Sequence, residues 1–566
     1  MKTRMHWVGA LALAMGCFGG AAAAQAQNEP SLNRGSDEPF VVVSVAGVDK
    51  LLGDVSYLTE SAGAGDVGRM AVLMAGPYTV GIDRAKPWGV LVFPEGVDFR
   101  ALAFVPVTDL DRVLATFREQ IGAPEDVGEG VLKLATPEPS FVKESGGYAF
   151  IAQKAEDFKS LPMNPADLLG GLDKKYTLAA RVNLKAFPAE LKEIAISEMR
   201  ASMERELEGG AGDLGPDEAE VVRTMAKRSV DQMEQLFNES EHLTIGLAVD
   251  GTARNFHLDV NFTAQAGTKL ARQMNMLSDT KSGFAGFLLD DAAVNMNLSG
   301  KLMPEDIEQF SSLLKAGRAR AMEELDKDAE LSDADRAVAK EAAGTVLDLL
   351  QKTVESGKLD GGAAVLLGEE QLTMVAGGHV AGAKDLEATF RKLVDVAREK
   401  DPNFDKVEVK FNAEKHGDVT FHVLTGPVDE PEAARVLGEK ADIVLGLGTD
   451  SLYVAIGNKG IETLKQVIDK SAADAGKSVP PMQLNVALAP ILKFAAAQGD
   501  DPVVAALAAI SERFADNDKV KFVEESVPNG VNIRVEIEEG VLKLIGETVK
   551  LMQGAGGAAP GGFEGF

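Results

Sequence analysis

The sequence predicts an α+β protein of two tandem, similar halves, each a mostly antiparallel sheet packed with amphipathic helices and helical hairpins. Three observations lead to this fold class. Several segments alternate apolar and polar residues with a period of two, as strands with one covered face do. Asp-Gly and Asn-Gly, which tolerate the backbone of tight hairpin turns, follow or precede such segments. Between them lie segments with helical periodicity, and the same order of elements recurs in both halves.

The N-terminus carries the features of a secretory signal peptide. Lys2 and Arg4 form a short positive region, and an apolar stretch that ends in small residues follows. Ala24-Gln25-Ala26 matches an A-x-A cleavage site, so we predict Ala24 and Ala26 as the signal-cleavage residues and Gln27 as the first mature residue. The predicted location is the periplasm or the extracellular space. Two alternatives stay open, which are retention of the leader as a membrane anchor and lipidation at Cys17.

The composition restricts the partners and the chemistry of the mature chain. The 566 residues include 87 acidic and 58 basic side chains, with a formal net charge of −29. Nucleic acids and anionic membranes are bound through clustered Lys and Arg, so neither is an expected partner. Cys17 is the one cysteine, and loss of the leader would leave no disulfide or thiolate chemistry. Beyond Ala26, uncharged runs stay below the roughly 18 residues of a membrane-spanning helix, so no transmembrane segment is expected in the mature chain.

The chain is expected to contain an internal repeat. The predicted ranges are 1–26 for the signal peptide, 27–37 for a polar lead-in, 38–278 for the first α+β repeat, 283–552 for the second and 553–566 for a Gly-rich disordered tail. Three pairs of segments share a strand followed by a helix, namely 101–105 with 372–375, 148–152 with 453–457, and 178–184 with 484–488. A fourth pair consists of the last hairpins of the two halves. Four recurrences in one order indicate a duplication.

The predicted hairpins are defined by alternation around a turn. Residues 243–249 and 256–262 flank Asp250-Gly251, and residues 531–537 follow Asn529-Gly530, so we expect a two-residue turn at each dipeptide. The second half adds a further hairpin, predicted to pair 407–411 with 419–423.

Long helical hairpins are also expected. Apolar stripes at 191–207 and 222–237 are separated by a Gly-rich break at 208–216, and residues 304–356 supply a matching insertion in the second half. Ser332 to Asp335 resembles a capping box at the start of the later helix. The stripes carry Met199, Met203, Met225 and Met233, which are interpreted either as ordinary core or as the lining of an adaptable apolar groove.

No residue pattern singles out a catalytic or cofactor site. His257 and Asp259 lie two residues apart on one strand face and could share a metal, but the interpretation favoured is a solvated strand face, and His422 has a similar position. Gly476-Lys477-Ser478 lacks the earlier glycine of a phosphate-binding loop, and no Gly-x-Ser-x-Gly occurs. We therefore predict no catalytic residue, no cofactor and no metal.

With its leader, cysteine-free acidic body, duplicated order of elements and Gly-rich tail, the chain resembles the large, exported, uncharacterised proteins of planctomycete-type bacteria. The resemblance covers the mature chain and brings no catalytic residues with it. The leading expectation is an extracytoplasmic, non-enzymatic binding or interaction scaffold, with an unknown protein or an apolar ligand as its partner. The alternatives are a carrier of an apolar or lipid-like ligand and a hydrolase with a dispersed active site.

Overall fold

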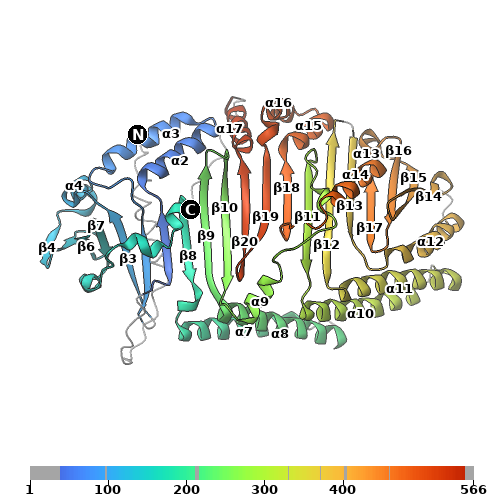
Figure 1. Ribbon diagram of the computed structural model, residues 1–566, viewed down its shortest axis with the longest axis horizontal. Coiled ribbons are helices and arrows are strands. Elements are labelled where there is room, and N and C mark those ends of the chain that lie inside the picture. The colour runs from blue at the N-terminus through green and yellow to red at the C-terminus, as the bar shows by residue number, and fades with distance from the viewer. Residues whose placement is uncertain are drawn as a thin grey trace. The chain divides into compact units, whose positions relative to one another are not determined.

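The computed structural model describes residues 38–554, apart from 96–97, 211–215, 329–330, 370, 401–403 and 458 (Figure 1). The predicted leader with Ala24 and Ala26, the lead-in and the tail lie outside the described residues, as does most of the break at 208–216. The contacts divide the chain into two units. Unit 1 contains Gly68–Ala248 and the chain before Tyr57, and unit 2 contains Tyr57–Val67 and the chain from Val249 onward.

The strands of unit 1 form an antiparallel sheet in the order β9-β8-β1-β2-β3-β7-β6-β5-β4. Their bounds are Val41–Val45 (β1), Trp88–Glu95 (β2), Asp98–Pro106 (β3), Glu125–Gly128 (β4), Val131–Leu134 (β5), Ser140–Ser145 (β6), Tyr148–Ala152 (β7), Leu178–Asn183 (β8) and Ser240–Asp250 (β9).

The strands of unit 2 form an antiparallel sheet in the order β10-β20-β19-β18-β11-β12-β13-β17-β16-β15-β14. Their bounds are Asn255–Ala264 (β10), Val294–Lys301 (β11), Lys358–Gly368 (β12), Gln371–His379 (β13), Glu408–His416 (β14), Val419–Pro427 (β15), Lys440–Leu447 (β16), Ser451–Ile456 (β17), Met482–Ala487 (β18), Lys519–Val527 (β19) and Gly530–Glu538 (β20). Antiparallel sheets with many helices confirm the α+β class.

The strand orders of the two units correspond. Raising each strand number of unit 1 by ten gives β19-β18-β11-β12-β13-β17-β16-β15-β14, which is the order within unit 2. The segment pairs found in the sequence fall on such strands: β3 with β13, β7 with β17, and β8 with β18. The hairpin β14–β15 is present as predicted, and the short strands β4 and β5 hold its place in unit 1, so it is not an addition to the second half.

Helices connect the strands at corresponding points. Their bounds are Val48–Ser61 (α2), Gly65–Tyr78 (α3), Leu110–Thr116 (α4), Arg118–Ile121 (α5), Leu172–Lys175 (α6), Ala189–Gly210 (α7), Pro216–Glu239 (α8), Lys269–Asn275 (α9), Pro304–Lys327 (α10), Asp333–Glu355 (α11), Leu386–Lys400 (α12), Pro431–Leu437 (α13), Gly460–Ala473 (α14), Leu488–Gln498 (α15), Pro502–Ser511 (α16) and Glu539–Gly554 (α17). Helix α11 begins after Ser332, whose hydroxyl accepts a hydrogen bond from the Asp335 N–H at 3.2 Å, as the capping pattern predicts.

The two long helical hairpins, however, are not counterparts, and this part of the prediction is wrong. Helices α10 and α11 follow β11, where α2 and α3 follow β1, whereas α7 and α8 follow β8, where α15 and α16 follow β18. Length and polarity made α7–α8 and α10–α11 look alike in the sequence.

Both hairpin turns differ from the two-residue turns expected at Asp250-Gly251 and Asn529-Gly530. Four residues, 251–254, separate β9 from β10, and the positive φ of 58° falls on Arg254. The Asp250 carboxylate accepts hydrogen bonds from the Thr252 and Ala253 N–H groups and so favours the longer turn. Between β19 and β20 the turn does have two residues, but it is shifted by one position, to Pro528-Asn529 with φ of 57° at Asn529.

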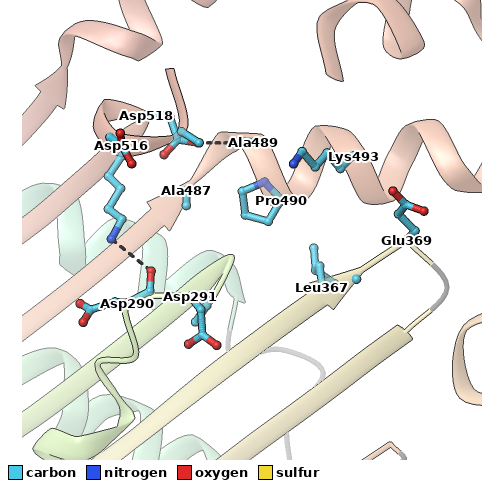
Figure 2. A pocket seen from close by; sticks show the side chains of 14 residues that line it. Asp290, Asp291, Leu367, Glu369, Ala487, Ala489, Pro490, Lys493, Asp516 and Asp518 are labelled. Atoms are coloured by element: carbon cyan, nitrogen blue, oxygen red, sulfur yellow. Dashed lines mark hydrogen bonds between the residues drawn. The ribbon is translucent and has the colours of Figure 1, made fainter. Parts of the chain in front are cut away.

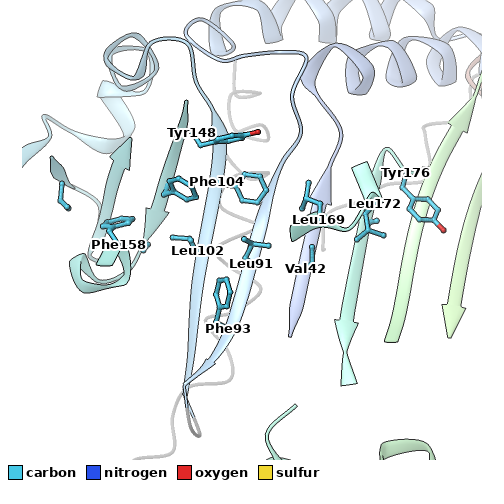
Figure 3. Close-up of a cluster of buried hydrophobic side chains, with 14 of the residues drawn as sticks. Val42, Leu91, Phe93, Leu102, Phe104, Tyr148, Phe158, Leu169, Leu172 and Tyr176 are labelled. Carbon is cyan, nitrogen blue, oxygen red and sulfur yellow. The ribbon is translucent and has the colours of Figure 1, made fainter. Parts of the chain in front are cut away.

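The core of unit 1 lies on one face of its sheet. Figure 3 shows Val42, Leu91, Leu102 and Phe104 on that face, with Leu169 of the connection between β7 and β8 packed over them. All of these side chains are buried. The connection supplies apolar groups through short helical turns, and burial of such side chains stabilises each by roughly 1.5–3 kcal/mol.

Unit 2 covers the corresponding face with helix α14 and with the segment 280–292, here called the strap. Phe284, Phe287 and Leu289 of the strap lie in the apolar core. Polar strand residues hold the strap in place, since Asn297 donates to the Ser282 hydroxyl at 2.8 Å and that hydroxyl donates to the Asp360 carboxylate at 2.6 Å. Buried polar groups are tolerated here because they hydrogen-bond to one another or to the strap backbone.

Candidate functional site

The face of each sheet opposite its core, here called the open face, is apolar. In unit 2 it can be followed through the register, because residues opposite each other on paired strands point to the same side. Val260 is opposite Ile533, Met296 is opposite Leu484 and Ala363, and Met374 is opposite Ile456. The open face of unit 2 includes Leu258, Val260, Ile533, Val535, Phe522, Leu484, Met296, Ala363, Val365, Met374, Val454, Ile443 and Leu445.

Large side chains on this face are accessible to water. Ile443 is 47% exposed, and Leu258, Met374 and Val454 are also exposed, while the other members are half-buried by their strand neighbours. By contrast, residues that point to the opposite side of the same strands, such as Val444, are buried. The strands thus place aliphatic side chains on their uncovered side. A contiguous apolar surface of this kind marks an interaction site in soluble proteins.

Unit 1 has an open face of the same kind only on β9, β8, β1 and β2, because Val142 and Ala149, on the same side of β6 and β7, are buried against Leu110 of α4. Val43 is opposite Ala180 and Val90, and Ala180 is opposite Ile245 on β9. Ile245 is exposed, as is Leu178, while the alternate residue Leu91 is buried in the core.

Helix α3 offers a second kind of apolar surface. Its buried or half-buried positions are small, including Gly68 and Ala75, whereas Met70, Leu73 and Met74 point outward. Leu73 is 74% exposed. The usual arrangement of an amphipathic helix is thereby reversed, with small residues inside and large apolar residues outside.

One carboxylate interrupts the open face of unit 2. Glu524 is opposite Ile533 on one side and Met482 on the other, and it is half-buried. Burial raises the pKa of Glu524, and no charged neighbour offsets this. Within the described residues the Glu524 carboxylate makes no hydrogen bond or ion pair, so it is available to a partner.

A cavity of about 600 Å³ lies in unit 2 at the edge where β12 and β18 end and β11 and β19 begin (Figure 2). Asp290 and Asp291 lie on one side of it, and Asp516 and Asp518 on another. The residues lining it are Asp290, Asp291, Ala292, Leu367, Gly368, Glu369, Ala487, Ala489, Pro490, Lys493, Ala515, Asp516, Asp518 and Lys519. Five carboxylates face two lysines, so the cavity is acidic, and the described residues of its lining include no serine, cysteine or histidine to serve as a nucleophile and its base.

Asp518 is the buried acid of this cavity, with 1% of the residue exposed. One of its carboxylate oxygens, Oδ2, accepts a hydrogen bond from the Ala489 N–H at the start of α15. The other oxygen, Oδ1, is buried and has no hydrogen-bond partner. Burial raises the pKa of Asp518, and the backbone hydrogen bonds only partly oppose that increase.

The residues considered as candidate metal ligands in the sequence have structural roles. Asp259 is fully buried and forms two hydrogen bonds with the Arg534 guanidinium, at 2.7 and 2.9 Å, so the expected solvated strand face is wrong at this position. A carboxylate engaged in this way is not free to bind a metal with His257. The ion pair joins β10 to β20, and its role is structural.

His422 is buried as well, which corrects its expected place on a polar strand face. Its ring packs against Phe390 and Phe411, with centroids 5.8 and 6.0 Å away, and Nδ1 accepts a hydrogen bond from the Asn412 N–H. Burial lowers the pKa of His422, so the neutral ring is favoured.

The described side chains do not test the methionine groove, because they include only two of its four methionines. Met199 is half-buried and Met233 is exposed, which places Met233 outside the core, while the side chains of Met203 and Met225 lie outside the described set. Among the described residues, no group of three His, Cys, Asp or Glu side chains is placed to hold a metal ion. Every helix in the described ranges is too short or too polar to cross a lipid bilayer.

Comparison with protein-family models, curated proteins and solved structures finds no match to this chain.

Proposed function

We propose that the protein is an exported, non-enzymatic scaffold whose open faces dock an apolar surface of another protein. The observation that carries this proposal is the exposure of aliphatic side chains on one side of part of each sheet, including Ile443, Met374 and Ile245. Covering this face would remove water from side chains of the kind that fills protein interiors.

The arrangement of the backbone favours a protein surface as the occupant. The interior strands are paired on both sides, so a partner cannot add a strand to them and must pack face to face. Nine strands spaced about 4.8 Å apart, with roughly 14 Å of open face along each, offer on the order of 600 Å². This approaches the roughly 800 Å² that each partner contributes to a stable protein complex.

A second candidate is the carrier of an amphipathic ligand, and Glu524 is the observation that favours it. A single carboxyl group within an apolar face could hydrogen-bond the polar head of a lipid-like molecule while the tail lies over Phe522 and Leu484. Ligands of that size are usually enclosed in concave pockets, however, and the cavity described above is acidic. The scaffold function is therefore preferred.

Site-specific photo-cross-linking in the producing cell tests the proposal. A benzophenone amino acid at Val454 should give a discrete adduct with another protein, and the same group at the exposed Glu525 on the other side of the sheet should give none. Ile443→Asp on the same face should abolish the adduct, whereas Val503→Asp on the exposed side of α16 should leave it intact. Adducts only with lipid or with a second copy, or no adduct, would overturn the proposed docking of another protein.

Export is part of the same proposal and rests on the N-terminal sequence. Sequencing the mature N-terminus should return Gln27, which follows the A-x-A site. A blocked, lipidated Cys17 or an intact leader would instead anchor the protein at a membrane.

The corresponding strand orders support a proposal about the origin of the chain, namely that it contains two copies of one ten-stranded repeat. In this proposal β1 to β10 form the first copy and β11 to β20 the second. The predicted boundaries at 38–278 and 283–552 remain a prediction. Residues 283–552 expressed alone should fold and unfold cooperatively if the second repeat is a complete folding domain.

A further inference from the structure

We infer that the protein docked on the open face of unit 2 presents a basic side chain, Lys or Arg, within its apolar surface, and that this cation pairs with Glu524. The inference rests on the docking function proposed above and names the chemistry of the partner. Two observations carry it. Glu524 lies within an apolar row of the sheet, and its carboxylate has no partner among the described residues, whereas cations on the other side of the same strands are paired.

The register places Glu524 at the centre of a row of side chains that crosses five strands. Glu524 on β19 is opposite Ile533 on β20 and Met482 on β18. The same row continues to Val260 on β10 and Leu298 on β11. The four neighbours are apolar, and all five side chains are half-buried and so within reach of a partner. A protein that covers this row therefore also covers the carboxylate.

Lys521 and Arg534, which point to the other side of β19 and β20, are already paired. Lys521 forms an ion pair with Glu536 at 3.0 Å, and Arg534 forms one with Asp259 at 2.7 Å. Alternate residues of a strand point to opposite sides, so neither cation shares the open face with Glu524. Burial raises the pKa of Glu524 because no positive charge compensates for the lost water. The open face thus holds a carboxylate that the described chain leaves without a counter-charge.

Docking increases the need for a counter-charge at this position. A partner that covers the face removes further water from Glu524, and an ionised carboxylate without a counter-charge is unfavourable in an apolar interface. A Lys or Arg of the partner compensates for the lost water. Its methylene groups can pack along Phe522 and Met482 while its charged end reaches the carboxylate. The net charge of −29 likewise favours a basic partner surface.

The alternative occupants of the open face fit this carboxylate less well. A second copy docked through the same face would bring the Glu524 carboxylates of two chains toward each other where the faces overlap, and like charges repel. The hydrocarbon chain of a lipid offers neither a charge nor a hydrogen-bond donor. A basic side chain of another protein supplies both.

The yield of the benzophenone adduct at Val454, measured in the producing cell, tests the inference in the full chain. Glu524→Gln removes the charge at constant size and should lower the yield of the adduct with the other protein by about tenfold or more. The Glu524 carboxylate makes no hydrogen bond or ion pair within the described residues, so the substitution breaks none. Glu525→Gln is the matched control, because Glu525 is adjacent, exposed and on the other side of the sheet. It should leave the yield unchanged.

Glu524→Leu separates recognition of a cation from a role in keeping the free face soluble. If the carboxylate only kept the face soluble, leucine would enlarge the apolar surface and raise the adduct yield. Pairing with a cation predicts the opposite, a decrease of about tenfold or more, because the cation of the partner is left without a counter-charge. A yield equal to or above that of the unmodified chain in either Glu524 variant would overturn the inference and leave the docking function intact. Absence of a protein adduct in the chain that retains Glu524 would overturn the docking function itself.

Discussion

Breaking the buried ion pair between Asp259 and Arg534 should destabilise unit 2 by about 2–3 kcal/mol. Asp259 is completely buried, and its two oxygens accept hydrogen bonds from Arg534 Nε and Nη2 at 2.7 and 2.9 Å. Hydrogen bonding to Asp259 raises the pKa of Arg534, so the guanidinium stays charged. Asp259→Asn removes the negative charge without changing the size of the side chain.

The magnitude follows from the exposure of the two partners. Removing one member of a fully buried pair typically costs about 3–5 kcal/mol, because the other charge is left without compensation. The Arg534 side chain is 29% exposed, so water can solvate part of its charge once Asp259 is neutral. This lowers the expected cost to the range given above, which corresponds to a decrease of several degrees in the melting temperature.

Urea unfolding followed by far-ultraviolet circular dichroism measures the effect, and a double-mutant cycle assigns it to the pair. Asp259→Asn, Arg534→Gln and the double variant should show a coupling energy of about 1–2 kcal/mol. After loss of the leader, Trp88 of unit 1 is the one remaining tryptophan, so its fluorescence reports that unit separately. The reasoning would be refuted if the two single effects were additive within about 0.3 kcal/mol.

Two further predictions concern pH dependence and backbone packing. Burial lowers the pKa of His422, so the unfolded chain takes up a proton first and stability should fall as the pH decreases below about 6.5. The urea midpoint of unfolding, measured at neutral and at mildly acidic pH, should fall less in His422→Phe than in the unmodified protein. An equal fall in both proteins would contradict the assignment of this pH dependence to His422. Gly89→Ala should destabilise unit 1 by about 2–3 kcal/mol, because the added Cβ would lie 2.2 Å from the Val43 carbonyl oxygen. The control is Gly53→Ala in helix α2, where no atom lies within 4 Å of the new Cβ, and it should be neutral or stabilising by up to about 1 kcal/mol. Thermal unfolding measures both variants. Equal effects of the two substitutions would exclude a steric clash at position 89 as the cause.

Local sequence patterns predicted most of the helices and strands but not which of them pair or pack together. Alternation located β10, β14, β15 and β20, and the cap at Ser332 located the start of α11, because these signals depend on residues a few positions apart. The connectivity of the helical hairpins was misjudged, since the strands that flank a hairpin pair with segments far away in the chain. The Asp250 turn was predicted too short because its length depends on side-chain hydrogen bonds to the backbone.

The candidate sites could not be located from the sequence. The cavity at Asp518 is assembled from four separate segments, and the acidity that distinguishes it is common throughout a chain with 87 acidic residues. Asp259 and Arg534 are 275 positions apart, so no local pattern connects them. A signal for the open faces was present in the alternating strands, but it did not reveal which side would stay uncovered.

The sequence by itself determined the α+β class, because the period of two and the helical period are properties of neighbouring residues. Only the tertiary structure decided which strand face is covered. On β11 the strap covers Asn295, Asn297 and Ser299, while Met296 lies on the open face, the reverse of what polarity alone suggests. The reason is that strand geometry fixes only that alternate side chains point to opposite sides. The side that is buried depends on where the strap and α14 pack, and hydrogen bonds that those polar residues donate to the strap make their burial possible.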